Sequence, residues 1–357
     1  MDTIPEKQQY HDAELGSSGS LLPNDEASAL LSPRLPPSSN TKPTKSPLQY
    51  LYTLYMFTRS DFKTVIIPQS IFALCAASRT ESSPAARNMP SFIIRVAFML
   101  LWLWLHLIVE NVANQRLEAS VLEDAANKPW RPIPSGLISP RQSQAILRYA
   151  VPLCLLASSS VGGMPLLLPS ATLMVFVWLY NDLDGSAAGP LQRSAINAAG
   201  LACFGWGALA VLLSGEGLFS AAGAATINEH GGGEILPRTL QLWIALTALV
   251  VFSTVHAADF PDVEGDRERG RQTMPLVYGE AASRWVLAVA VPGWSVASLL
   301  FWDVAVGVYW VAPLLVAGCM ASLTVLRRDD HGSDEGVWKL WCLWTVTLFV
   351  LPLAGST

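Results

Sequence analysis

The sequence predicts an all-α membrane protein, a polytopic helical bundle of about nine transmembrane helices around a central cavity. Hydrophobic residues make up 51% of the 357 residues and charged residues only 14%, against roughly 25% in an ordinary soluble protein. From about residue 62 onward, the apolar residues fall into stretches close to the roughly 20 residues that a helix needs to cross a bilayer. The few charges gather between these stretches, so the chain is expected to use the lipid bilayer as its solvent.

The N-terminal segment differs from the rest of the chain. Residues 1–47 are rich in Ser, Pro and acidic residues and show no hydrophobic periodicity, so they are predicted to form a disordered cytosolic tail. They contain no apolar core of the signal-peptide type, and their acids, such as Asp2 and Glu6, are unlike a mitochondrial presequence. Residues 48–357 are then predicted to form the membrane domain.

Nine stretches are apolar enough to be spans. The first and third are short, and only a brief break around Asp303 separates the seventh from the eighth. In chain order the predicted spans are residues 62–78, 92–113, 144–161, 164–182, 194–214, 236–258, 283–301, 304–326 and 337–355.

The positive-inside rule orients this bundle. With a cytosolic N-terminus, thirteen Arg and Lys residues fall in the inner loops and four in the outer loops. This distribution places the loops after the second and sixth spans on the cytosolic side. The endoplasmic reticulum is the expected membrane, because no other targeting signal is found.

The loop after the sixth span contains a dense acidic motif. Asp259, Asp262 and Asp266 recur at spacings of three and four, which place carboxylates on one helical face. Such carboxylates repel one another unless a cation lies between them, and Mg²⁺ prefers a few carboxylates together with phosphate oxygens. Arg267 and Arg271 would complement phosphate groups. The alternative interpretation is a solvated helix end with ordinary Arg partners.

The loop after the second span contains a second acidic motif. Asn114 and Glu118 lie one helical turn apart, and Glu123 and Asp124 follow. The next residues, 127–136, read NKPWRPIPSG, and their three prolines exclude a regular helix. The positive-inside bias alone would explain some of the basic residues here.

These motifs resemble those of the UbiA superfamily of intramembrane prenyltransferases, whose pattern is NDxxDxxxD, a loop ending in NKPxRPIPSG, and a later DxxxD. Residues 127–136 and 262–267 match closely. The resemblance implies that the two motifs bind Mg²⁺ and the diphosphate of an isoprenoid, whose tail lies in an apolar tunnel. The first motif departs from the pattern, because Gln115 follows Asn114 and the spacing to the last acids is two residues longer.

The resemblance gives each candidate residue a role. The candidate catalytic residues are Asp262, Asp266, Asp124 and Glu118. The candidate diphosphate-binding residues are Asn114, Lys128, Arg131, Arg193, Arg267 and Arg271. The candidate Mg²⁺ ligands are Glu118, Glu123, Asp124, Asp259, Asp262 and Asp266.

The altered first motif and the segment Tyr180–Gly185 resemble a fungal branch that includes UbiA-type sesquiterpene cyclases. The resemblance favours cyclisation of farnesyl diphosphate, in which the substrate's own double bonds attack the cation. The first alternative is prenyl transfer to an aromatic or other small acceptor, which needs a second pocket and a proton acceptor. The second is a transporter, although transporters place their acids nearer the membrane midplane. The expected partners are the bilayer and the isoprenoid diphosphate, with no nucleic acid.

Aromatic and histidine side chains in the spans offer further candidates. An aromatic face stabilises a cation, but Trp and Tyr are also common at membrane interfaces and in cores. His106 and His256 are each either a general base or a hydrogen-bonded packing residue. The aromatic candidates are Trp102, Trp104, Trp178, Tyr180, Phe204, Trp206 and Trp243.

Overall fold

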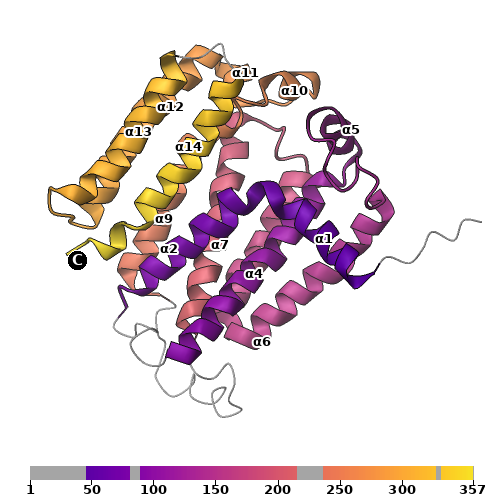
Figure 1. The fold of residues 1–357 in the computed structure, drawn as a ribbon, viewed down its shortest axis with the longest axis horizontal. Helices are drawn as coiled ribbons and strands as arrows, with labels where there is room; N and C mark the ends of the chain where they lie inside the picture. Colours follow the sequence, from indigo (N-terminus) through magenta and orange to yellow (C-terminus); the bar gives the residue numbers. More distant parts are fainter. Residues whose placement is uncertain (1–45, 81–88, 215–235, 327–330, 357) are drawn as a thin grey trace, which may run out of the picture. The chain divides into compact units, whose positions relative to one another are not determined.

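The computed structural model describes residues 46–80, 89–214, 236–326 and 331–356. Every regular element within these ranges is a helix or a helical turn, and none is a strand (Figure 1). The all-α prediction is therefore confirmed for this part of the chain. The predicted tail lies almost wholly outside the described residues, so its disorder stays a prediction.

The described elements are α-helices joined in places by short 3-10 or π turns, labelled η. In chain order they are α1 (Pro47–Thr58), η1 (Arg59–Asp61), η2 (Phe62–Ile66), α2 (Ile67–Ala77), α4 (Met89–Gln115), α5 (Glu118–Asn127), α6 (Pro140–Asn181), α7 (Pro190–Leu213), α9 (Arg238–Thr254), η4 (Val255–Ala258), α10 (Val263–Glu268), α11 (Met274–Tyr278), α12 (Glu280–Phe301), α13 (Val308–Leu326), α14 (His331–Phe349) and η5 (Leu351–Leu353).

The first helical stretch is interrupted. α1 begins at a capping box, in which the side chains of Ser46 and Gln49 each accept a hydrogen bond from the other's backbone N–H. The π turn η2 precedes Pro68, which donates no backbone hydrogen bond and whose ring crowds the carbonyl four residues earlier. The proline therefore accounts for the widened turn between η1 and α2.

The longest helix, α6, is broken at Gly163, whose φ of 59° and ψ of −148° are not helical. Trp102 on α4 donates a hydrogen bond to Ser158 at 2.9 Å, and His106, one turn further, pairs with Ser170 at 2.7 Å. Positions 158 and 170 would lie about 18 Å apart along a straight helix. The chain therefore bends sharply at Gly163, and both halves of α6 lie against the same part of α4.

Seven helices in the described part of the chain are long and apolar enough to cross a membrane. Two differences separate this number from the nine predicted spans. The third and fourth predicted spans fall in the two halves of the broken α6, which counts as one helix. The first predicted span falls on η2 and α2, which have 5 and 11 residues and are each too short to cross a membrane. The count of nine stays a prediction.

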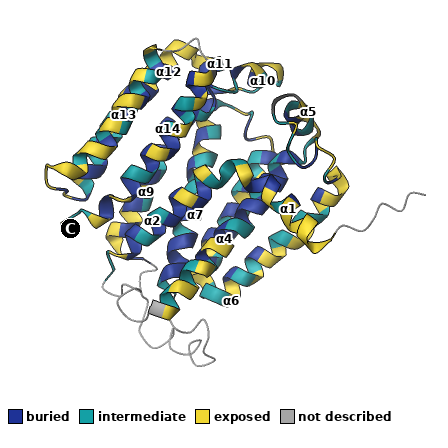
Figure 2. Cartoon of the chain, in the orientation of Figure 1, coloured by how far each residue is buried: buried dark blue, intermediate teal, exposed yellow. Residues whose placement is uncertain are grey.

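The helix α7 lies at the centre of the larger group of helices and contacts α2, α4, α6 and α9 (Figure 1). Close packing requires small residues on its surface. A Cβ atom at Gly207 would lie 2.0 Å from the ring of Trp102 on α4. Buried residues face the inside of the bundle, whereas large apolar residues such as Leu156, Trp285 and Leu315 are exposed on its outside, as a lipid-facing surface requires (Figure 2).

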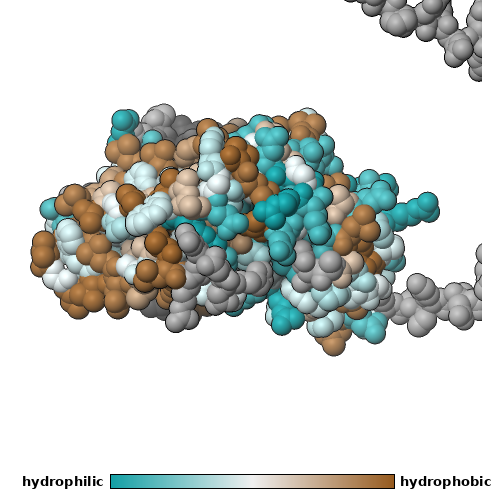
Figure 3. Space-filling view, turned by 90° about the horizontal axis from the view of Figure 1, so that it is seen from above, coloured by the Kyte–Doolittle hydropathy of each residue, from teal (hydrophilic) through white to brown (hydrophobic). Residues whose placement is uncertain are grey.

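The polar loops gather at one end of the bundle. α5, α10 and α11 lie together there in Figure 1, and Figure 3 views the molecule from this end. Hydrophilic residues cluster over the middle of this face, whereas hydrophobic residues dominate the side formed by α12 and α13 (Figure 3). The fold thus brings two loops that are far apart in the sequence to one surface.

Candidate active site

The acidic motif that contains Asp259, Asp262 and Asp266 lies in the turn between η4 and α10. Asp259 precedes the helix, and Pro261 lacks the N–H that a continuous helix would need. Asp262 is the N-cap residue of α10, and the backbone N–H of Asp266 donates to its carbonyl at 2.8 Å. The expected stripe of three aspartates is therefore helical only from Asp262 onward.

Two of these three aspartates are buried. Asp266 is 0% exposed, and its Oδ1 accepts a hydrogen bond from Arg271 at 2.8 Å. Its Oδ2 is buried without a hydrogen-bond partner among the described residues. Asp259 is 4% exposed, and burial raises its pKa to about 6, although the Arg193 guanidinium opposes the rise. A buried carboxylate oxygen without a partner is costly, so Asp266 offers a position that suits a cation.

The other acidic motif lies on α5 and the proline-rich loop after it. Asp124 is buried, and both of its carboxylate oxygens accept hydrogen bonds from Nη1 of Arg131, at 2.7 and 2.9 Å. Burial raises the pKa of Asp124, although Arg131 and Lys128 oppose the rise. The loop therefore folds back so that its own arginine neutralises the acid.

Glu123 joins the two motifs. Its Oε2 accepts a hydrogen bond at 2.8 Å from Arg269, which is 146 residues away in sequence, and its Oε1 lies 3.6 Å from Nη1 of Arg271. Arg271 also contacts Asp266, so one guanidinium serves a carboxylate from each motif. Burial would raise the pKa of Glu123, but Arg271 and Arg269 outweigh burial and hold the pKa below its ordinary value.

Arg193 forms a second ion pair at the same end of the bundle. It lies in the first turn of α7 and contacts Oδ1 of Asp259, with Nε at 3.2 Å. It also donates to the Tyr180 hydroxyl at 2.8 Å and to the Ser186 carbonyl at 3.4 Å. These contacts tie the beginning of α7 to the ends of α6 and η4.

The remaining predicted site residues are less enclosed. Glu118 is exposed in the first turn of α5, and Arg267 is exposed on α10. Asn114, Lys128 and Asp262 are half-buried. Within the described parts of the chain, Glu118 takes part in none of the ion pairs that join the two loops.

Gln115, which stands where the family pattern has an aspartate, has a packing contact. It is buried, and its side-chain amide donates to the Phe57 carbonyl at the end of α1 and to the Asn111 side chain. The substitution therefore exchanges an acid for a neutral link between α1 and α4.

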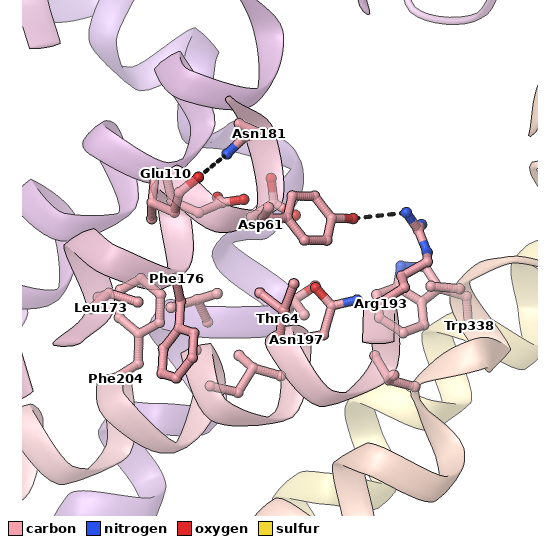
Figure 4. Close-up of a pocket in the computed structure, with 18 residues that line it drawn as sticks. Asp61, Thr64, Glu110, Leu173, Phe176, Asn181, Arg193, Asn197, Phe204 and Trp338 are labelled. Atoms are coloured by element: carbon pink, nitrogen blue, oxygen red, sulfur yellow. Dashed lines mark hydrogen bonds between the residues drawn. The ribbon is translucent and has the colours of Figure 1, made fainter. Parts of the chain in front are cut away.

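A cavity of about 220 Å³ lies between the helices, and Arg193 lines it (Figure 4). Leu173 and Phe176 from α6 and Phe204 from α7 supply apolar wall. The residues that line it are Asp61, Thr64, Val65, Glu110, Leu173, Phe176, Val177, Tyr180, Asn181, Arg193, Ile196, Asn197, Gly200, Leu201, Phe204, Val255, Ala258 and Trp338. The cavity thus combines a cationic guanidinium with an aromatic and aliphatic lining.

The structure sorts the aromatic and histidine candidates. Tyr180 and Phe204 line the cavity, whereas Trp243 packs against other aromatic rings and Trp178 is exposed. Trp102 is hydrogen-bonded to α6, and Trp104 donates to Thr58. Both histidines, His106 through Ser170 and His256 through the Ser283 carbonyl, make packing hydrogen bonds.

Two acidic residues of the cavity, Glu110 and Asp61, were missed by the sequence interpretation. Glu110 lies within the membrane-spanning part of α4, and Asp61 ends η1. The signal was present in the sequence HLIVEN, where one acid interrupts an apolar span. Ionisable residues inside a span are expensive and usually functional.

The acidic residues of the two loops are suited to a Mg²⁺ ion that is bound partly by the phosphate groups of a substrate. No group of three or more His, Cys, Asp or Glu side chains is arranged to hold a metal ion within the described ranges. Mg²⁺ commonly binds through one or two carboxylates and uses substrate phosphates and water for its other positions. The unpartnered Oδ2 of Asp266, close to arginines that bind phosphate well, fits such a shared site.

Comparison with known proteins identifies the class of this chain. The sequence model of the UbiA prenyltransferase family matches residues 66–343. The chain belongs to this family and is a multi-pass membrane enzyme of the UbiA type. A UbiA homolog from Archaeoglobus fulgidus bound to GPP and Mg²⁺ shares the fold, with a TM-score of 0.55 and 11% identity over 84% of this chain and 99% of that one.

Characterised relatives resemble nearly the whole chain. The fumagillin beta-trans-bergamotene synthase af520 of Aspergillus fumigatus is 31% identical over 87% of this chain and 94% of its own length. The polyprenyl transferase eriF of Hericium erinaceus is 30% identical over 84% of this chain and 93% of its own length. The relatives thus include both a terpene synthase and a prenyl transferase.

Proposed function

We propose that this enzyme is a Mg²⁺-dependent terpene cyclase of the endoplasmic reticulum membrane, with its motif loops in the cytosol. It ionises farnesyl diphosphate and cyclises the resulting cation to a sesquiterpene. One observation carries the proposal: two acidic and basic loops, joined through Glu123, lie at the same end of the bundle as a cavity that Arg193 lines and that has aromatic and aliphatic wall. The likeness to a terpene synthase over most of both chains supports it.

Both loops contribute carboxylates for Mg²⁺ and basic side chains for the diphosphate. Asp259, Asp262 and Asp266 on one side and Glu123 and Asp124 on the other are the proposed carboxylate ligands of Mg²⁺. When bound, Mg²⁺ supplies positive charge that stabilises the departing diphosphate. Lys128, Arg131, Arg193, Arg269 and Arg271 are the basic residues placed to hold phosphate oxygens, and Asn114 and Arg267 are the less enclosed candidates.

The cavity is the proposed site of the isoprenoid tail. Cleavage of the C–O bond leaves an allylic cation, which water would capture in an open site. Leu173 and Phe176 exclude water by filling the wall with apolar surface, and the rings of Phe176 and Phe204 offer faces to positive charge. Arg193 is placed to hold the diphosphate at the cavity wall.

Prenyl transfer is the second candidate function. The likeness to the polyprenyl transferase eriF favours it, at nearly the same identity as the likeness to the synthase. The altered first motif, in which Gln115 stands where the family pattern has an aspartate and donates a hydrogen bond to the Phe57 carbonyl, favours cyclisation. The two reactions share the ionisation step and differ in what attacks the cation.

The test supplies the enzyme in membranes with farnesyl diphosphate and Mg²⁺ alone. Diphosphate release and a cyclic hydrocarbon in the extract are both expected, and chelation of Mg²⁺ by EDTA should reduce both at least about 100-fold. Readdition of Mg²⁺ should restore them. Release of diphosphate only after addition of an aromatic or other small acceptor would contradict cyclisation and establish transfer.

A further inference from the structure

Two acids of the cavity, Glu110 and Asp61, lie outside the two acidic loops. Glu110 is on α4, five residues before the helix ends at Gln115, which places it about 7 Å inside the end of the helix. A carboxyl group at this depth is costly and requires a compensating function. No Lys, Arg or His of the described chain forms an ion pair with Glu110, so a structural salt bridge does not account for it.

The position of Glu110 matches the isoprenoid part of the substrate. Glu110 and Asn114 are four residues apart and share one face of α4, with Glu110 one turn deeper. If Asn114 contacts the diphosphate, Glu110 reaches the first carbons of the chain. In Figure 4, Glu110 and Asp61 lie on one side of the cavity and Arg193 on the other, and Phe176 and Phe204 lie on the same side as Glu110.

A hydrogen bond fixes the direction of this carboxylate. The side-chain amide of Asn111 donates to Oε2 of Glu110 at 2.9 Å. An amide donor leaves the acid able to accept a proton, because it holds one oxygen without supplying a positive charge. The surrounding apolar wall strengthens any interaction between the carboxylate and a cation in the cavity.

We propose that Glu110 is the base that ends the cyclisation, an inference that rests on the proposed terpene cyclase function. Its carboxylate removes a proton from a carbon next to the cationic carbon. The electrons of that C–H bond form the product's double bond, and the proton is left on Glu110. Asp61, half-exposed on η1 and on the same cavity wall, provides the route by which the proton returns to water.

The test separates ionisation from termination. Wild-type and variant enzymes receive farnesyl diphosphate and Mg²⁺, and both released diphosphate and organic products are quantified. Glu110→Gln is expected to keep diphosphate release within about threefold, while the wild-type hydrocarbon formed per diphosphate falls at least about tenfold and water-captured alcohols or other alkene isomers increase. Glu335→Gln, the same change at an exposed acid of α14, should leave the product ratio unchanged.

Two results would overturn the proposal. One is a wild-type product ratio in Glu110→Gln; the other is loss of diphosphate release in a variant with wild-type thermal stability, which would assign Glu110 to ionisation. If Glu110→Gln does not fold, Glu110→Asp decides, because a shortened carboxylate should lower the hydrocarbon fraction at least about twofold and an unchanged fraction contradicts the role. A wild-type enzyme that needs an acceptor to release diphosphate would instead refute the terpene cyclase function.

Discussion

The two acidic loops meet at the same end of the bundle but are built differently. In the loop around α10, Asp259 and Asp266 are 4% and 0% exposed; Asp259 is the C-cap residue of η4, and Asp266 lies in the helical turn that begins at Asp262. In the loop around α5, Asp124 is buried against Arg131 of its own loop, whereas Glu123 is half-buried and Glu118 is exposed. Asp266 is paired with Arg271 of its own loop and Asp259 with Arg193 of α7, whereas Glu123 is held by arginines of the other loop.

If the loops bind the diphosphate as proposed, this difference predicts different parts for them in substrate binding. Four carboxylates of the two loops are ion-paired with four arginines before a ligand arrives: Glu123, Asp124, Asp259 and Asp266 with Arg131, Arg193, Arg269 and Arg271. A magnesium diphosphate adds charges of both signs, and arginines can pass from carboxylate to phosphate without leaving a buried charge unpaired. Under the proposed function, we therefore expect the α10 loop to act as the fixed half of the site and the α5 loop as the half whose arginines exchange partners.

The strongest way to break this comparison is Asp266→Asn, in the fixed half. The amide cannot neutralise Arg271 or offer an anionic oxygen to a cation, so the rate of diphosphate release is expected to fall at least about 100-fold. Membrane insertion should be unaffected, because the residue lies outside the spans. The matched control is Glu268→Gln at the exposed end of the same helix. Equal rates of diphosphate release in both variants would refute the role of the α10 loop as the fixed half of the site.

A smaller effect is expected where the two loops touch. Glu123→Gln and Arg269→Gln should each raise the KM for the diphosphate substrate about tenfold, with less change in kcat, because each loosens the contact that aligns the loops. The KM of the double variant should be little higher than that of either single variant. This non-additivity corresponds to a coupling free energy of about 1 kcal/mol or more between two groups in contact. Additive effects would show that the loops bind the substrate independently.

Much of the fold followed from composition and spacing. Apolar stretches and the positive-inside bias predicted a membrane bundle with its acidic loops on one side, and the proline-rich segment 127–136 predicted a non-helical loop. The sharp bend of α6 was harder to predict in detail, because Gly163 lies in an apolar run with Gly162, and only its φ shows which residue breaks the helix.

The candidate site was predicted as a set of residues but not as a set of pairs. Sequence spacing placed Asp262 and Asp266 one turn apart, since that relation is local. The contact between Glu123 and Arg269 spans 146 residues and depends on how the helices pack, which no local pattern encodes. Glu110 was not predicted, because a single acid within an apolar span has no neighbouring acids and so forms no recognisable metal-binding motif.

The smallest effect is expected at Glu118, the acid of the α5 loop that lies farthest from the ion pairs. Glu118→Gln should change the rate of diphosphate release by about twofold or less, because Glu118 is the first residue of α5 and its side chain is exposed to solvent. The rate is measured beside that of Glu123→Gln, which lies on the same helix. A tenfold loss in Glu118→Gln would mean that α5 turns when substrate binds and brings Glu118 to the metal. The two loops would then become alike in the bound state, and the contrast between a fixed and an exchanging half would hold only without substrate.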